Sequence, residues 1–550
     1  MYLKSLVLIV MVCVVAMGCQ SLSSSPTVGP ALDNIRGSDI AAHLRFLSLD
    51  LLEGRAPATR GGNLAAEYLA TQLAALDFAP AGDDDTYFQE MNILESTVHP
   101  QIQFSLVGGP SFEYLTEVVA VSDLLTPKVS ISGEVVFVGH GIVAPELHWN
   151  DYADIDMTDR IALVMVNDPP ATPEEPDLFG GDALTYYGRW TYKYEEAARQ
   201  GAAGVILIHT DESATYPWQV VQSSWSGPQY SLLQDVEESV LTLKAWVSEP
   251  AARRLTSHAG YDLDVLRSNA LQRGARPVPL GVLVSGSIQQ DVVRSTASNV
   301  IGVLQGTDTS QGVLFTAHYD HLGMIAASSE ALITSDQIFN GAVDNASGVA
   351  GLLEISQALA RSHTRPVRSI YVVFTTAEEA GLLGAEYFAL HSPLPLNQWA
   401  ANINVDGLNL YGRTRDIVLL GADRSTLGVL ANSLAKARNR IVGLDPAPER
   451  GYFFRSDHFP MAKAGIPAVS LGSPTDYIGQ DAEHGKRLAD QYNENDYHQP
   501  SDDFRTNWNY IGAVEDLQLL AELGWYVAME RVMPKYYPDD PFSQFRAEIP

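Results

Sequence analysis

Apolar residues recur at two different spacings along the chain, helical near the start and strand-like further on. In residues 38–77 they recur three or four positions apart, and the Gly/Pro/Arg-rich stretch 54–62 interrupts the pattern. This pattern predicts two helices joined by a loop. Short β-like runs follow at 101–107 and 133–138, separated by turn residues, and they predict strands.

The middle of the chain predicts a small mixed β/α unit. Residues 160–166 and 204–209 are short apolar segments, and the second is preceded by the helical pattern of residues 193–200. From residue 297 onward strand-like runs alternate with helical ones. The predicted strands are 300–304, 313–317, 369–375, 403–405 and 468–471, with a helix at 346–361. Such alternation predicts an α/β fold with a mostly parallel sheet flanked by helices, in which functional groups gather at the carboxyl ends of strands.

The first residues indicate export. Lys4 is followed by the apolar run 5–18 and then by Cys19, which is the pattern of a signal peptide and is too short to span a bilayer comfortably. The stretch VAMGC resembles a lipoprotein signal, which implies a signal peptide over residues 1–19 and a lipid on Cys19. The expected location is then the periplasmic or outer face of a bacterial membrane; ordinary signal cleavage, giving a periplasmic or secreted protein, stays open. Residues 20–35, rich in Ser, Pro and Gly at first, are expected to be a tether.

Composition narrows the functional classes. With 550 residues the chain is long enough for two or three domains of ~100–250 residues. Its net charge of -31 argues against a nucleic-acid partner, because phosphate binding needs a cationic surface. Both cysteines, Cys13 and Cys19, lie in the predicted signal peptide, so cysteine chemistry is excluded from the mature body.

Unusual polar clusters follow the predicted strands of the second half. His318 and Asp320 come directly after the strand 313–317, Glu378 and Glu379 follow 369–375, and Asp406 follows 403–405. Two further clusters are the loop GAVDNASG, which contains Asp344 and opens a helix, and the segment YHQPSD, which contains His498.

Two imidazoles and three carboxylates form a ligand set suited to zinc. A pair of metals needs a short bridging group, and Asp344 is best placed because the glycines around it let the backbone approach closely. Of the adjacent acids Glu378 and Glu379, one is expected to coordinate and the other to transfer protons. Asp320 can accept a hydrogen bond from His318 and fix its orientation. Asn345 and Ser347 are expected to cap a helix.

The motifs HYDH, GAVDNASG, EE before AGLLGA, NVDG, RSDHFPMAKAGIPAV and YHQPSD together resemble the co-catalytic dinuclear zinc aminopeptidases. The resemblance runs from residue 297 to about 526 and extends to LEGRAPATRGGNLAAEYLA, while KYEEAARQGAAGVILIHT resembles a protease-associated domain. The implied organisation is an N-terminal helical part at 36–108, an inserted protease-associated-like domain at 109–290 and the main peptidase domain at 291–550.

The resemblance implies a role for each residue of the set in peptide hydrolysis by two zinc ions. His318 and Asp406 would bind one ion and Glu379 and His498 the other, with Asp344 bridging them and Glu378 acting as general base on a bridging water. The family also uses a donor to stabilise the oxyanion, and Tyr452 is the candidate, with Asp457 a supporting residue in the same region. The remaining histidines, His321 among them, receive no role.

Three alternatives stay open. A glutamate-releasing carboxypeptidase of the same fold needs a basic pocket, and two arginines brought together by folding would not be visible in the sequence. A glutaminyl cyclase uses one zinc. A non-catalytic binding module is a third reading, opposed by the complete set of ligands.

Overall fold

The computed structural model describes residues 28–99, 102–214, 216–233, 240–324 and 336–547. The predicted signal peptide with Cys13 and Cys19, and residues 20–27 of the predicted tether, lie outside the described residues. The rest of that tether is packed: Ala31 and Leu32 of α1 (Gly29–Leu32) are buried, and α1 contacts α9 (Gly348–Ala360). The prediction of a tether up to residue 35 is therefore wrong, because the apolar residues of 28–35 join the core.

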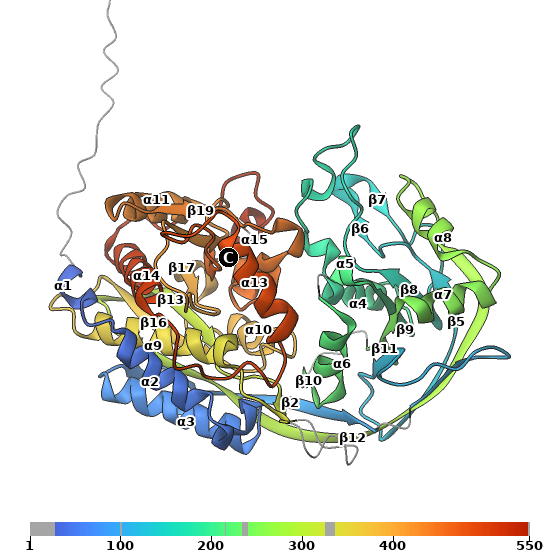
Figure 1. The fold of residues 1–550 in the computed structure, drawn as a ribbon, viewed down its shortest axis with the longest axis horizontal. Helices are drawn as coiled ribbons and strands as arrows, with labels where there is room; N and C mark the ends of the chain where they lie inside the picture. Colours follow the sequence, from blue (N-terminus) through green and yellow to red (C-terminus); the bar gives the residue numbers. More distant parts are fainter. Residues whose placement is uncertain (1–27, 100–101, 215, 234–239, 325–335, 548–550) are drawn as a thin grey trace, which may run out of the picture.

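The described chain forms two lobes joined by one long strand (Figure 1). We call residues 28–99 and 290–547 the main lobe and residues 102–289 the inserted lobe. Strand β2 (Phe88–Val98) pairs antiparallel with the second half of β12 (Val278–Leu304). The first half of β12 pairs with β3 (Gln103–Leu106) and β5 (Lys128–Phe137) of the inserted lobe. One continuous strand therefore runs through both lobes.

The main lobe contains the predicted sheet. Its strand order is β19 (Ile441–Gly443), β18 (Asp416–Leu420), β20 (Ala468–Gly472), β17 (Trp399–Asn404), β13 (Asp308–His318), β16 (Arg368–Thr375) and β12. The central strands β20, β17, β13 and β16 are parallel, whereas β18 and β12 are antiparallel to their inner neighbours. The predicted α/β fold with a mostly parallel sheet is confirmed.

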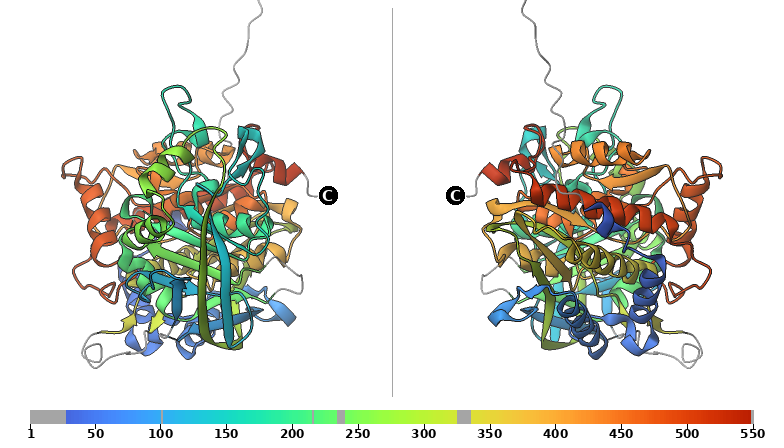
Figure 2. Two further views of the ribbon diagram at one scale, coloured as in Figure 1. Left: turned by 90° about the vertical axis from the view of Figure 1, so that its right-hand side faces the viewer. Right: turned by 90° about the vertical axis from the view of Figure 1, so that its left-hand side faces the viewer.

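Helices cover both faces of this sheet. One face carries α2 (Gly37–Leu47), α3 (Arg60–Ala75), α9 and α14 (Ile511–Met529); the other carries α10 (Leu383–Leu390) and α12 (His458–Lys463). In the right-hand view of Figure 2, α14 and the N-terminal helices lie on the near side. Strand β13 is apolar on both faces, since Val313 and Phe315 pack on the first set of helices and Leu314 on the second. Burial on both faces is what a central parallel strand requires.

The inserted lobe is a smaller β/α unit. Its parallel strands are β5, β8 (Arg160–Met165), β9 (Gly204–His209) and β11 (Leu243–Ser248), with β4 (Val118–Val121) antiparallel at the edge. Helices α4 (Trp190–Arg199) and α6 (Trp218–Ser226) contribute to the core on one side, and α7 (Glu249–His258) and α8 (Leu263–Ala270) to the core on the other. The predicted boundary at residue 109 is too late, because Phe104 and Leu106 of β3 belong to the core of this lobe.

The other helices and strands are β1 (Ala79–Pro80), β6 (Val143–Ala144), β7 (Trp149–Asn150), α5 (Asp211–Ala214), β10 (Gln229–Leu232), β14 (Gly323–Met324), β15 (Ile338–Phe339), α11 (Thr426–Ala437), α13 (His484–Asn495) and α15 (Ser543–Ala547). None of the helices in the described part of the chain is long and apolar enough to cross a membrane.

Candidate metal centre

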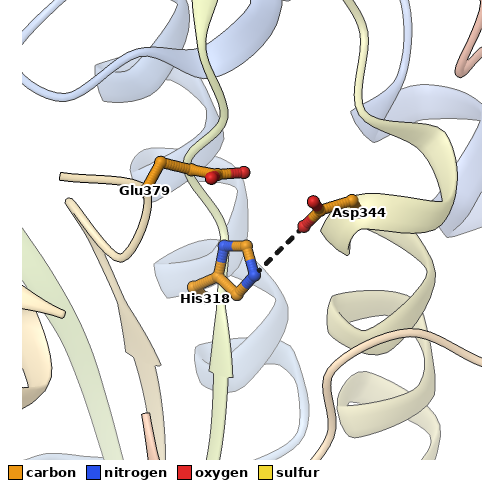
Figure 3. A group of neighbouring side chains, drawn as sticks. All are labelled: His318, Asp344 and Glu379. Atoms are coloured by element: carbon orange, nitrogen blue, oxygen red, sulfur yellow. Dashed lines mark ion pairs between the residues drawn. The ribbon is translucent and has the colours of Figure 1, made fainter. Parts of the chain in front are cut away.

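The carboxyl ends of three neighbouring strands bring the predicted ligands together. His318 is the last residue of β13, Glu378 and Glu379 follow β16, and Asp406 follows β17. Asp344 enters from the turn before α9, and Figure 3 shows its carboxylate facing His318 with Glu379 beside them. Residues far apart in sequence thus meet at one edge of the sheet, as expected for an open parallel sheet.

Asp344 lies between the two histidines and offers a different oxygen to each. Its Oδ1 is 3.3 Å from Nε2 of His318 and its Oδ2 is 3.4 Å from Nε2 of His498. A carboxylate in this position can join two cations, one beside each imidazole.

Each histidine has a second carboxylate of its own. Nε2 of His318 lies 3.2 Å from Oδ1 of Asp406, and Nε2 of His498 lies 3.0 Å from Oε2 of Glu379. Ligand atoms of two overlapping groups lie within 4.8 Å of one another; the groups are His318, Asp344 and Glu379, and His318, Glu378 and Asp406. The geometry is compatible with the pairing that the family resemblance implies.

The cluster favours positive charge at both imidazoles. Burial alone would lower the pKa of His498, but Glu379 and Asp344 outweigh it and raise that pKa to about 10. Burial likewise opposes protonation of His318, and the carboxylates of Glu378 and Asp406 raise its pKa well above the usual value. A site that stabilises cationic imidazole in this way also stabilises a metal cation in its place.

The donor set fits zinc. Nε2 of His498 is buried and has no hydrogen-bond partner of acceptable geometry among the described residues, although two carboxylates surround it. A buried nitrogen without a partner is costly, and a cation placed between it and these oxygens would satisfy all of them. His318, Asp344, Glu379, Asp406 and His498 are the residues that would hold the metal.

Glu378 offers a carboxylate oxygen within 4.8 Å of ligand atoms of His318 and Asp406. It is buried, and burial together with the negative charges of Glu379 and Asp406 raises its pKa well above the usual value, against the lowering effect of His318. A raised pKa makes the carboxylate a better proton acceptor, which suits a group that takes a proton and returns it.

Asp320 supports the acidic pair more directly than the histidine. Its carboxylate lies 3.8 Å from Nδ1 of His318, whereas its oxygens accept hydrogen bonds from the backbone N–H groups of Glu378 (3.2 Å) and Glu379 (3.4 Å). The carbonyl oxygen of Asp320 lies nearer to Nδ1 of His318 than its carboxylate does, at 3.3 Å. The main chain of Asp320 therefore orients the imidazole, and its side chain orients the turn after β16.

The candidate oxyanion donor Tyr452 has its hydroxyl near two residues outside the cluster. Its hydroxyl is 3.2 Å from Nη1 of Arg450 and 3.4 Å from Nδ2 of Asn493. The ring of Tyr497, which received no role from the sequence, instead stacks on His498 with ring centres 3.9 Å apart. Burial and the charges of Asp344 and Glu379 raise the pKa of Tyr497 well above its usual value, so its phenol stays protonated.

Asp457 is fully buried beneath the centre. Its carboxylate accepts a 2.5 Å hydrogen bond from Thr375 at the end of β16. Burial raises its pKa to about 6, while the charge of His318 opposes that shift. Asp457 therefore belongs to the surroundings of the site rather than to its ligand atoms.

Three further residues hold the loop of Asp344. Oxygens of Asp502 accept hydrogen bonds from the N–H groups of Val343 (3.0 Å) and Asp344 (3.1 Å). The Asn345 amide oxygen accepts from Gly348, as a cap would, but also from Gly407 at 2.8 Å. The Ser347 hydroxyl accepts from Leu408 at 3.0 Å. The two residues expected to cap a helix therefore also tie the Asp344 loop to the Asp406 loop.

Sequence reasoning missed two other contacts. His321 lies with Nδ1 2.6 Å from Oε1 of Glu379, whose other oxygen, Oε2, is the one near His498. Arg55, at the end of the LEGR segment, is fully buried and donates to the carbonyl oxygens of Tyr319 (2.8 Å), Asn340 (2.6 Å) and Gly341 (3.0 Å). The only sequence signal for Arg55 was its place in the family-like stretch LEGRAPATRGGNLAAEYLA. His321 was read as a lone histidine, and a lone histidine gives no signal of a functional role.

Two curated proteins resemble parts of the chain. Aminopeptidase NAALADL1 of Mus musculus is 34% identical over 134 residues, which cover 23% of this chain and 16% of that protein. Leupeptin-inactivating enzyme 1 of Streptomyces exfoliatus is 27% identical over 183 residues, which cover 33% of this chain and 37% of that protein. The chain thus spans well under half of the length of either relative.

The fold is shared more widely than the sequence. The structure of the aminopeptidase from Aneurinibacillus sp. strain AM-1 superposes with a TM-score of 0.53 at 16% identity, covering 94% of this chain and 99% of that one. At the level of sequence, residues 299–521 match Peptidase family M28, and this range includes every ligand-type residue of the cluster.

Proposed function

We propose that this chain is a zinc aminopeptidase that uses two ions to remove N-terminal residues from peptides. The observation that carries the proposal is the placement of Asp344, whose two oxygens lie 3.3 and 3.4 Å from the Nε2 atoms of His318 and His498. The local similarity to the mouse aminopeptidase NAALADL1 supports the same reaction, and the fold shared with the Aneurinibacillus aminopeptidase is compatible with it.

When bound, two zinc ions would polarise the scissile carbonyl and acidify the attacking water. Glu378 accepts the proton of that water and returns it to the leaving amine, since its raised pKa suits both steps. Tyr497, protonated and stacked on His498, donates a hydrogen bond to the developing oxyanion. The surrounding carboxylates attract the free amino group of the substrate, which would restrict cleavage to the first residue.

Metal analysis and two variants test this proposal. About two zinc ions per chain are expected, whereas about one would favour the cyclase and none the binding module. Glu378→Gln should retain both ions and lose about 10²–10⁴-fold in kcat on amino-acid anilides. Asp344→Ala should lose metal and activity together. Glu449→Gln, the same chemical change on an exposed residue, is the control. Full turnover in Glu378→Gln would overturn the role of the base.

A second candidate function is the release of a C-terminal residue, and one observation favours it. Arg189 of the inserted lobe has its pKa lowered to about 9 by burial and by the neighbouring charge of Arg455 in the main lobe. The Arg455 guanidinium also lies 5.8 Å from the ring centre of Tyr216. Folding brings the side chains of Arg189 and Arg455 together from different lobes, which the sequence could not show. A pair of arginines suits the binding of a substrate carboxylate.

Blocked peptides separate the two reactions. For an aminopeptidase, acetylation of the substrate N-terminus should abolish cleavage and amidation of its C-terminus should change little. For the carboxypeptidase the two effects should be reversed, and Arg189→Met should raise KM for free-acid substrates only. Equal KM for free-acid and amidated peptides in the unmodified protein would remove the second candidate.

We further propose that the protein is exported and carries an acyl group on Cys19, on the strength of the sequence VAMGC. Metabolic labelling with a fatty acid should mark the unmodified protein and not Cys19→Ala. If neither the unmodified protein nor Cys19→Ala is labelled, ordinary signal cleavage is the remaining explanation.

A further inference from the structure

One residue of the inserted lobe reaches into the candidate metal centre. The hydroxyl of Ser224, in α6, lies 3.0 Å from Nδ1 of His498. The other ring nitrogen, Nε2, faces Asp344 and Glu379. When Nε2 coordinates a metal, Nδ1 carries the proton and donates it in a hydrogen bond, here to the Ser224 hydroxyl.

Helix α6 is fixed by its own lobe. The Trp218 indole and the Gln222 amide both donate to the carbonyl oxygen of Leu115, each at 2.8 Å. Val221 is buried in the core formed with α4, and the ring of Trp225 lies 6.2 Å from that of Trp190. The position of the Ser224 hydroxyl is therefore set by the inserted lobe rather than by the histidine.

The ring of His498 is held at an edge and on a face. Tyr497 covers one face, with ring centres 3.9 Å apart, and Ser224 meets the Nδ1 edge. Stacking alone still allows the ring to slide across the face of Tyr497 by rotation about χ1, which would move Nε2 away from Asp344. A hydrogen bond at Nδ1 opposes that rotation.

The contact between the lobes does not depend on this one hydrogen bond. The N–H of Leu184 donates to the carbonyl oxygen of Pro448 at 2.9 Å, and Tyr186 packs on Phe459 with ring centres 4.9 Å apart. Removing the Ser224 hydroxyl should therefore leave the lobes in place and change only what Nδ1 meets.

We propose that Ser224 is a positioning residue through which the inserted lobe orients His498, so that one of the two ion sites is complete only when this lobe is in contact with the main lobe. The inference rests on the proposed two-zinc centre. It assigns the inserted lobe a part in metal binding, in addition to any effect on access of substrate. Loss of a hydrogen-bonding partner behind a metal ligand typically weakens metal binding by about 10–100-fold.

The matched pair Ser224→Thr and Ser224→Val tests the proposal, because the two replacement side chains have nearly the same shape and only threonine keeps a hydroxyl. Zinc affinity is measured by competition with a chromophoric chelator, on the full chain. We expect Ser224→Val and Ser224→Ala to bind one of the two ions about 10–100-fold more weakly, and Ser224→Thr to stay within a few-fold of the unmodified protein.

Ser223→Ala is the control on the same helix, because the Ser223 hydroxyl donates within α6, to the carbonyl oxygens of Gln219 and Val220 at 3.1 Å. It should bind both ions normally and show the same unfolding midpoint as Ser224→Ala. If Ser224→Val bound each of the two zinc ions as tightly as Ser224→Thr does, the role of Ser224 would be overturned. An unmodified protein that binds fewer than two zinc ions would instead overturn the proposed function, so the two failures are distinguishable.

Discussion

Replacing Arg55 should damage the metal centre without touching a ligand. Arg55 is 1% exposed and donates four hydrogen bonds to main-chain carbonyl oxygens. Three of the acceptors flank predicted ligands: Tyr319 follows His318, and Asn340 and Gly341 precede Asp344. The fourth, Leu47, ends α2. The guanidinium therefore joins an N-terminal helix to both ligand-bearing loops.

The size of the effect follows from these contacts. Burial lowers the pKa of Arg55 to about 10, against the raising effect of Asp320 and Asp502, so the group stays charged at neutral pH. A hydrogen bond to a charged donor contributes about 1.5–3 kcal/mol, which for four bonds exceeds about 6 kcal/mol before desolvation is counted. Removing the guanidinium also removes its desolvation cost, so we expect Arg55→Met to lose about 3–5 kcal/mol. Arg55→Lys keeps the charge but cannot reach all four carbonyl oxygens with one nitrogen.

Denaturant unfolding and zinc titration check this prediction together. Arg55→Met should unfold at a lower denaturant concentration and bind zinc at least about 10-fold more weakly, and Arg55→Lys should fall between it and the unmodified protein. Arg60→Lys is the control, because Arg60 is exposed and makes a 3.0 Å ion pair with Glu53, worth under about 1 kcal/mol. If Arg55→Met unfolded and bound zinc like Arg60→Lys, the role assigned to the buried guanidinium would be refuted.

Two other predictions concern the oxyanion donor and the response to acid. Tyr497→Phe keeps the ring on His498 and loses the hydroxyl, so kcat should fall about 10²–10³-fold with zinc binding unchanged. The control variant Tyr452→Phe should keep its turnover. The reverse result would restore Tyr452 as the donor. Burial and the charge of Lys193 lower the pKa of His140 from 6.5 to about 3, so below about pH 6.5 the unfolded chain binds a proton that the folded chain does not. Unfolding free energy should drop by about 2 kcal/mol through this residue between pH 6.5 and 5, and His140→Gln should show a shallower pH dependence by denaturant titration; parallel curves would contradict the assignment.

Local patterns predicted those elements whose signals are complete within a few residues. Strand β9 (Gly204–His209) has the predicted bounds, because an uninterrupted apolar run between a glycine-containing turn and a polar residue needs no distant information. The 27-residue strand β12 could not be predicted as one element. Its middle is polar and half-exposed, and only pairing with β2 and β5 from elsewhere in the chain keeps it extended.

The candidate site divides in the same way. Acids and histidines that follow apolar runs could be predicted as a group, because parallel strands end at the same edge of the sheet. The sequence could not predict which atom of the site contacts which other atom. The sequence offers Ser223, Ser224 and Ser226 in one short helix, and only the contact between lobes distinguishes the one that reaches His498. The sequence favoured Tyr452 as the candidate phenol and gave Tyr497 no role, whereas the fold places the ring of Tyr497 on His498.

The way the lobes are joined explains why a serine in one can position a histidine in the other. Neighbouring residues of β12 pair with different lobes, since Gln289 pairs with Lys128 and Gln290 with Val98. Strand β10, which follows α6 directly, returns to pair with β2 of the main lobe, so the C-terminal end of the Ser224 region is tied to β2. Deleting the inserted lobe would therefore strip hydrogen bonds from β2 and β12 as well as removing Ser224, and a loss of zinc in such a deletion could not be assigned to either cause. Only substitutions that leave the shared strands intact can separate the orientation of His498 from the stability of the sheet beneath it.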